Sequence, residues 1–125
     1  MVGCDYYVAK KGDIGKRALC AEYAESIDMD GSSARAAWYW LLAGESAKAL
    51  SSAKRAVETG QSYAAGYAAM ALLLQGQRES ALDLLRRYRK EISFGGGWIK
   101  ELDILQRLYP DVGFSQLRSA LEDEK

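Results

Sequence analysis

The sequence contains no histidine, one proline and two cysteines. The lack of histidine removes the commonest general base and the commonest metal ligand. Cys4 and Cys20 are too few for a disulfide scaffold and form no Cys-x-x-Cys pair, which argues against a zinc or redox motif. We therefore expect no catalytic centre, no metal site and no cofactor. A reducing compartment is the simpler expectation, with Cys20 as a small buried residue.

Other features are scarce as well. Valine, isoleucine and threonine are few, so a β-sheet has little support. The N-terminus lacks the pattern of a signal peptide, and the longest apolar run, Ala68 to Leu74, is far shorter than the roughly 20 residues of a membrane span. The net charge is zero, which gives no general phosphate-binding surface. We expect a cytoplasmic protein without a membrane partner, and nucleic acid is not a favoured partner.

One basic cluster interrupts this balance, at Arg86, Arg87, Arg89 and Lys90. We expect it at the C-terminal end of a helix, where positive charge complements the helix dipole. An acidic partner is the main alternative explanation for the cluster.

Hydrophobic residues make up 49% of the chain, and alanine, the best helix former, is abundant. This composition predicts an all-α protein. Three glycines, Gly12, Gly44 and Gly76, are evenly spaced along the chain, with similar residues around them. Such a period indicates a repeat of two helices around a turn.

Within each unit the glycine is expected to end the first helix at positive φ. Asp13 and Ser46 are expected to cap the second helix, and Gln77 is a weaker candidate. That helix has an apolar stripe, and small residues mark where helices approach each other. The stripe is Leu50, Ala53, Ala56 and Val57 in one unit and Leu82, Leu85 and Tyr88 in the next, and the small pairs are Ala36-Ala37 and Ala68-Ala69.

The segment 37–57 resembles a tetratricopeptide repeat. The residues that carry the resemblance are Trp40, Gly44, Ala49, Ala53 and Ala56, then Leu72, Gly76, Ala81, Leu85 and Tyr88, and, more weakly, Val8, Gly12, Arg17, Ala21 and Ala24. The resemblance implies stacked antiparallel helical hairpins in a right-handed α-solenoid. The spacing of the glycines is slightly shorter than the family's usual repeat of about 34 residues. The proline that often ends the family's second helix is also missing.

The chain divides accordingly into one domain with four parts: a degenerate or truncated repeat (1–30), two repeats (31–60 and 61–92) and a capping pair of helices (97–125). The short start before Gly12 favours a fragment of a longer protein. Gly95-Gly96-Gly97 has neither the spacing nor the context of a phosphate-binding loop and is interpreted as a turn.

Two helices are predicted after this turn. The first runs from Trp98 to Tyr109 and is stopped by Pro110. Its apolar side carries Ile99, Leu102, Leu105, Leu108 and Tyr109. The second, capped by Asp111 or Ser115, carries Phe114, Leu117, Ala120 and Leu121.

The resemblance also implies where a partner would bind, because the first helix of each unit lines the concave face in that family. The residues that fall there are Tyr6, Arg35, Trp38, Leu41, Leu42, Tyr63, Tyr67, Met70 and Leu74. The family's clamp for a terminal carboxylate needs Lys and Asn at such positions, whereas these are mostly aromatic or aliphatic. An amphipathic helix or an apolar segment suits the surface better. Trp40 and Leu72 are expected in the core.

An uncovered stripe of this kind exceeds what a monomer normally exposes. A partner, another part of the parent chain or a second copy is therefore expected to cover it. The function expected is a protein- or peptide-binding adaptor or scaffold. The alternatives are a regulatory or sensor domain of a larger bacterial signalling or transcription protein, with a small molecule inside the superhelix left open, and a small chaperone for a secretion-system subunit.

Overall fold

The computed structural model describes residues 17–29, 31, 33–94 and 98–123, and every regular element within them is helical. The all-α class is therefore confirmed. The elements are α2 (Arg17–Met29), α3 (Ser33–Leu42), α4 (Ser46–Glu58), a 3₁₀ turn η3 (Ser62–Ala64), α5 (Ala65–Leu74), α6 (Arg78–Arg87), α7 (Arg89–Phe94), α8 (Trp98–Leu108) and α9 (Phe114–Asp123).

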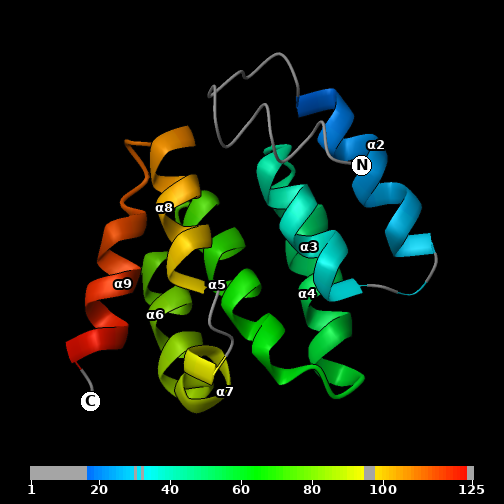
Figure 1. Ribbon diagram of the computed structural model, residues 1–125. Coiled ribbons are helices and arrows are strands. Elements are labelled where there is room, and N and C mark those ends of the chain that lie inside the picture. Colours follow the sequence, from blue (N-terminus) through cyan, green and yellow to red (C-terminus); the bar gives the residue numbers. More distant parts are fainter. Residues whose placement is uncertain (1–16, 30, 32, 95–97, 124–125) are drawn as a thin grey trace.

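The helices are arranged in space in nearly the order of the sequence, from α2 at one end to α9 at the other (Figure 1). The helices α3 and α4 pack against each other across a short turn, and so do α5 and α6. Further contacts join α2 to α3, α4 to α5, and α8 to α9. Two helical hairpins thus lie within the predicted repeats 31–60 and 61–92, with a further pair near the C-terminus. The solenoid itself stays a prediction.

The two hairpin turns are built in the same way. Gly44 and Gly76 both have a φ of 79°, a left-handed conformation that suits glycine. At the first turn the Gly44 N–H donates to the Leu41 carbonyl (3.1 Å) and the next N–H donates to the Trp40 carbonyl (2.9 Å). The same two bonds recur at the second turn, at 3.0 and 2.9 Å. This is the Schellman motif, and it satisfies carbonyls at the helix end. The predicted role of both glycines is confirmed.

The predicted helix caps were less accurate. Ser46 is the first residue of α4, the N-cap position belongs to Glu45, and no side chain caps this helix. Gln77 is an N-cap but makes no side-chain cap bond. The helix α9 begins at Phe114, so Ser115 lies inside the helix and is not its N-cap; the Ser115 N–H donates to the Gln106 side chain of α8 at 3.1 Å. Asp13 lies outside the described residues.

The basic cluster is split between two helices. The helix α6 ends at Arg87, Tyr88 is its C-cap, and α7 begins at Arg89. Arg86 and Arg87 occupy the last turn of α6, as predicted. The prediction is wrong for Arg89 and Lys90, which stand in the first turn of α7, where positive charge gains nothing from the helix dipole.

The core contains the predicted small residues. Ala36, Ala37 and Ala69 are fully buried and Ala68 nearly so, which lets the helices approach closely. Trp40 is also buried as predicted, whereas Leu72 is half-buried at the edge of the core.

The two cysteines were expected to be reduced. Cys20 is fully buried, as predicted, but its sulfur is disulfide-bonded, so the expectation of a thiol at this position is wrong. Cys4 lies outside the described residues.

A polar cluster joins α2, α3 and α4. The Asp28 carboxylate accepts hydrogen bonds from Ser52 Oγ (2.9 Å), Arg55 Nη2 (2.6 Å) and Ser33 Oγ (3.3 Å). Ser52 is almost fully buried, so its hydroxyl needs this acceptor. The cluster fixes the end of α2 on the neighbouring hairpin.

Candidate functional site

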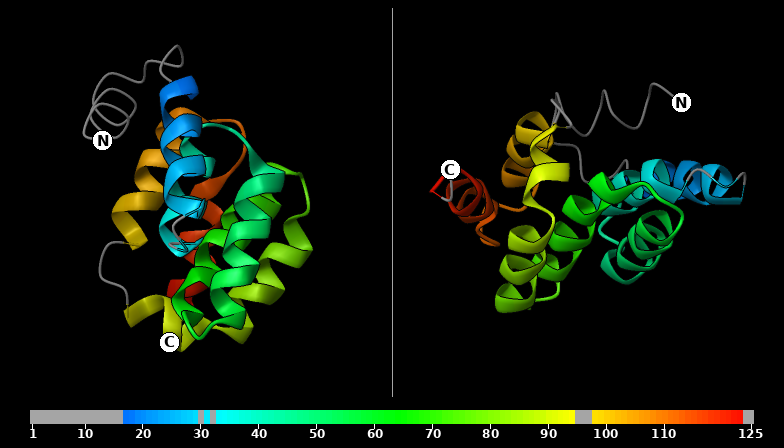
Figure 2. Two further views of the ribbon diagram at one scale, coloured as in Figure 1. Left: turned by 90° about the vertical axis from the view of Figure 1, so that its right-hand side faces the viewer. Right: turned by 90° about the horizontal axis from the view of Figure 1, so that it is seen from below.

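The helices α3 and α5 lie next to each other, and α8 contacts each of them. We call the side of the two helices that α8 contacts the α3–α5 face. Two residues that the sequence predicts for a partner surface, Trp38 of α3 and Tyr67 of α5, lie close together, with ring centroids 6.1 Å apart. The right-hand view in Figure 2 shows α8 and α9 at the end of the row opposite α2.

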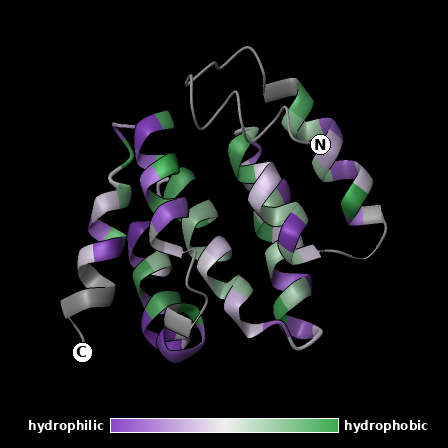
Figure 3. Ribbon diagram, viewed as in Figure 1, coloured by the Kyte–Doolittle hydropathy of each residue, from purple (hydrophilic) through white to green (hydrophobic). Residues whose placement is uncertain are grey.

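The helix α8 is amphipathic. In Figure 3 the ribbon of α8 alternates between purple, for hydrophilic residues, and green, for hydrophobic residues. Leu102 and Leu105, predicted for its apolar side, are 2% and 0% exposed, and Trp98 is 6% exposed. Lys100 and Arg107 are exposed on the remaining side. The α3–α5 face therefore already holds an amphipathic helix, supplied by the chain itself.

Two hydrogen bonds fasten α8 to this face. The first joins Tyr67 of α5 to Glu101 of α8, and the phenol oxygen lies 2.8 and 3.1 Å from the two carboxylate oxygens. Burial, and then the negative charge of Glu101, raise the pKa of the Tyr67 phenol far above its ordinary value of 10.0. Tyr67 is thus a neutral donor throughout the physiological range.

The second hydrogen bond holds the residue after α8. The Tyr109 hydroxyl donates to the Leu41 carbonyl at 2.9 Å and lies 3.4 Å from the Leu42 carbonyl. These carbonyls belong to the last turn of α3, where helix carbonyls lack partners within the helix. Tyr109 therefore connects the end of α8 to a helix that lies far earlier in the sequence.

At its first residue, Trp98, α8 approaches α5 closely at Gly66. A Cβ atom added to Gly66 would overlap the Trp98 indole, lying 2.9 Å from Cδ1, and would lie 3.4 Å from Ile92 Cγ2. Only a residue without a side chain permits this packing. Gly66 is the sequence signal for the covering helix, because it interrupts an otherwise alanine- and leucine-rich segment. Gly66 was not among the predicted site residues.

The predicted site residues divide into two groups. Trp38, Leu41, Leu42 and Met70 are at most 7% exposed, so they do not line an open groove in this structure. The expectation that they are exposed is wrong, because all four belong to the hydrophobic core, in the same cluster as Leu102 and Leu105 of α8.

The other predicted site residues are closer to solvent. Tyr63 is 44% exposed and Arg35 is exposed, whereas Tyr67 and Leu74 are half-buried. Tyr6 lies outside the described residues. The structure thus brings Trp38 and Tyr67 together but leaves Tyr63 and Arg35 at the margin. Their role in binding stays a prediction.

Among the residues that the structure describes, no three histidine, cysteine or carboxylate side chains are grouped so that they could hold a metal ion. In the same part of the chain, no helix has the length and apolar character needed to cross a bilayer. The expectations of no enzyme activity and of a cytoplasmic location stay predictions.

Comparisons with protein-family models, with curated proteins and with solved structures find no match to this chain. The resemblance to tetratricopeptide repeats therefore rests on the residues quoted above and on two hairpins with the same turn.

Proposed function

We propose that this chain is a protein-binding module of tetratricopeptide type whose α3–α5 face accepts an amphipathic helix. The observation that carries the proposal is α8, an amphipathic helix that lies on this face with Leu102 and Leu105 buried. In the state described, the chain's own helix takes the place of a partner. A partner helix would present similar apolar residues and would replace α8.

The attachment of α8 is suited to such an exchange. Polar contacts hold its two ends, through Glu101 and Tyr109, and the apolar residues lie between them. Each hydrogen bond contributes about 1 kcal/mol to the attachment. Because a partner competes with α8, the partner can bind only the small fraction of molecules in which the face is open. The apparent affinity of the partner is lowered in proportion to that fraction.

The test uses the full chain and a labelled synthetic peptide of residues 98–112. The double variant Glu101→Ala with Tyr109→Phe weakens the attachment of the chain's own α8, while the peptide still supplies both groups. We expect the variant to bind the peptide about thirtyfold more tightly than the unmodified chain, because the loss of two hydrogen bonds of about 1 kcal/mol each raises the open fraction. Fluorescence anisotropy measures both affinities.

Two controls make the result specific. The variant Lys100→Ala with Arg107→Ala alters the exposed side of α8 and should bind the peptide as the unmodified chain does. A peptide carrying Leu105→Asp should not bind, since a charge would enter an apolar site. Equal binding of both peptides, or no binding to the weakened variant, would refute an exchange of helices on this face.

The sensor and chaperone alternatives have no observation of their own in this structure and stay predictions.

A further inference from the structure

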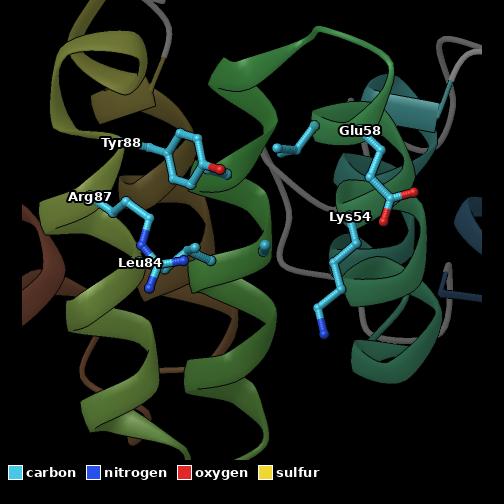
Figure 4. Close-up of a pocket in the computed structure, with 8 residues that line it drawn as sticks. Lys54, Glu58, Leu84, Arg87 and Tyr88 are labelled. Atoms are coloured by element: carbon cyan, nitrogen blue, oxygen red, sulfur yellow. The ribbon is translucent and has the colours of Figure 1, made fainter.

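A second surface lies on the opposite side of α5. Gly66 and Tyr67 face α8, whereas Ala65 and Ala68 are on the other side of the helix, because successive residues are about 100° apart around a helix. There the helices α4 and α6 flank α5 and form a pocket of about 240 Å³. We call it the α4–α6 pocket (Figure 4).

The floor of the pocket is apolar and its walls are charged. The floor is formed by Ala65 and Ala68 of α5, with Val57 and Leu84 beside them. The rim is formed by Lys54 and Glu58 of α4 and by Arg87 and Tyr88 at the end of α6 (Figure 4). The volume is below the roughly 300–1,000 Å³ of pockets for drug-sized molecules, so it suits one group the size of a side chain.

The charged residues that line the pocket, Lys54, Arg87 and Glu58, have a net charge of +1, and the helices that flank it are basic as a whole. The helix α4 has three basic residues and one acidic residue, α6 has three basic and two acidic, and α5 has none. These helices together have a net charge of +3 in a chain whose net charge is zero.

Some of these charges already have partners. Arg55 pairs with Asp28, and Arg86 lies 3.4 Å from Asp83. Within the described part of the chain, Lys54 and Arg87 form no hydrogen bond or ion pair. Glu58 is the one acidic residue on the rim, and it opposes two basic residues. The rim thus offers uncompensated positive charge next to an apolar floor.

We propose that the α4–α6 pocket binds an acidic segment of a partner protein through one aliphatic anchor side chain. The anchor contacts the alanine floor, and carboxylates on either side of it face Lys54 and Arg87. Charge complementarity of this kind accelerates association and selects the partner, and the apolar anchor supplies affinity. This site is separate from the α3–α5 face and does not depend on the release of α8.

The test uses three fluorescent peptides with blocked ends. The first has the sequence Asp-Glu-Leu-Glu-Asp, the second has Ala in place of Leu, and the third has Lys in place of every acidic residue. We expect the first peptide to bind to the full chain and to shift the NMR signals of Ala65, Ala68 and Leu84. Loss of the anchor should weaken binding about tenfold, as expected for a partly buried leucine. The basic peptide should not bind.

The matched variants reverse the same amount of charge in two places. Lys54→Glu with Arg87→Glu should weaken binding of the acidic leucine peptide at least about tenfold. Lys100→Glu with Arg107→Glu, on the exposed side of α8, should leave binding nearly unchanged.

Three results of the peptide experiments would overturn the proposal. They are equal binding of the alanine peptide, an equal loss in the α8 variant, and NMR shifts confined to α8. Self-association of the unmodified chain that Lys54→Glu with Arg87→Glu abolishes would identify the occupant as a second copy and would also overturn it.

Discussion

Replacing Gly66 with alanine tests how closely α8 is packed on the α3–α5 face. Gly66 lies in the first turn of α5, and a Cβ atom there would overlap the Trp98 indole, with Cδ1 at 2.9 Å. Trp98 is 6% exposed and is enclosed by the core, so it has little room to move. The helix or the indole must shift to make space for the methyl group.

Two opposing effects decide the sign of the change. Alanine is favoured over glycine in a helix by up to about 1 kcal/mol. Forcing an extra carbon into a packed core costs about 1–3 kcal/mol. Because Trp98 is held on several sides, we expect the second effect to win. The free energy of unfolding should fall by about 1 kcal/mol, and the midpoint of thermal unfolding by roughly 4 °C.

The assay is urea unfolding followed by circular dichroism, carried out on four chains. These are the unmodified chain, Gly66→Ala, Trp98→Leu and the double variant. Leucine at position 98 leaves space near Gly66, so alanine should stabilise the Trp98→Leu background by about 0.5–1 kcal/mol. The sign of the Gly66→Ala effect should therefore reverse between the two backgrounds. A stabilising effect in both would refute the close contact between α5 and α8.

Three further predictions concern other parts of the fold. Asp28→Ala should lower the free energy of unfolding by about 2 kcal/mol, because the buried Ser52 hydroxyl loses its acceptor. Asp103→Ala, at a surface ion pair, should change it little in the same urea titration. Above pH 10 the Tyr67 phenol keeps its proton in the folded chain and loses it in the unfolded chain, so the unfolding free energy of the unmodified chain falls as the pH rises. Tyr67→Phe should remove this part of the loss of stability. The comparison of the two chains by urea titration at about pH 9 and 11 isolates this contribution from the other tyrosines. Gly76→Ala should lower the free energy of unfolding, measured by thermal unfolding, by about 1 kcal/mol. Backbone strain alone causes this loss, since a Cβ atom at Gly76 would meet nothing within 4 Å. An unchanged midpoint would show that the left-handed turn is not required.

The sequence was most informative about features that depend on neighbouring residues. The glycines at 44 and 76 predicted the helix ends, because a left-handed residue at a helix C-terminus is a local requirement. The helix from Trp98 and its stop before Pro110 followed from periodicity and proline. These signals need no knowledge of the rest of the chain.

The sequence was least informative about contacts between distant segments. Nothing in the apolar pattern of α8 says which helices it contacts. Trp38 and Met70, predicted as groove residues, belong to the same core cluster as Leu102 and Leu105 of α8. The Gln106 cap on α9 was missed for a similar reason, because the capping residue belongs to the preceding helix. The α4–α6 pocket, too, depends on how two hairpins pack.

The bond from Tyr109 to the end of α3 links the C-terminal pair of helices to two successive hairpins. The helix α8 is anchored to α5 near its start, and the residue that follows it reaches α3, one hairpin further back. A copy of residues 45–76 inserted after Gly76 would add one more hairpin turn with the same glycine and the same backbone hydrogen bonds. It would also move α8 one unit along, and Tyr109 would then meet the end of the original α5 at Leu73 and Leu74. The C-terminal pair thus takes its position from the two hairpins that directly precede it, and in a longer chain it would find the same carbonyl partners one hairpin further along.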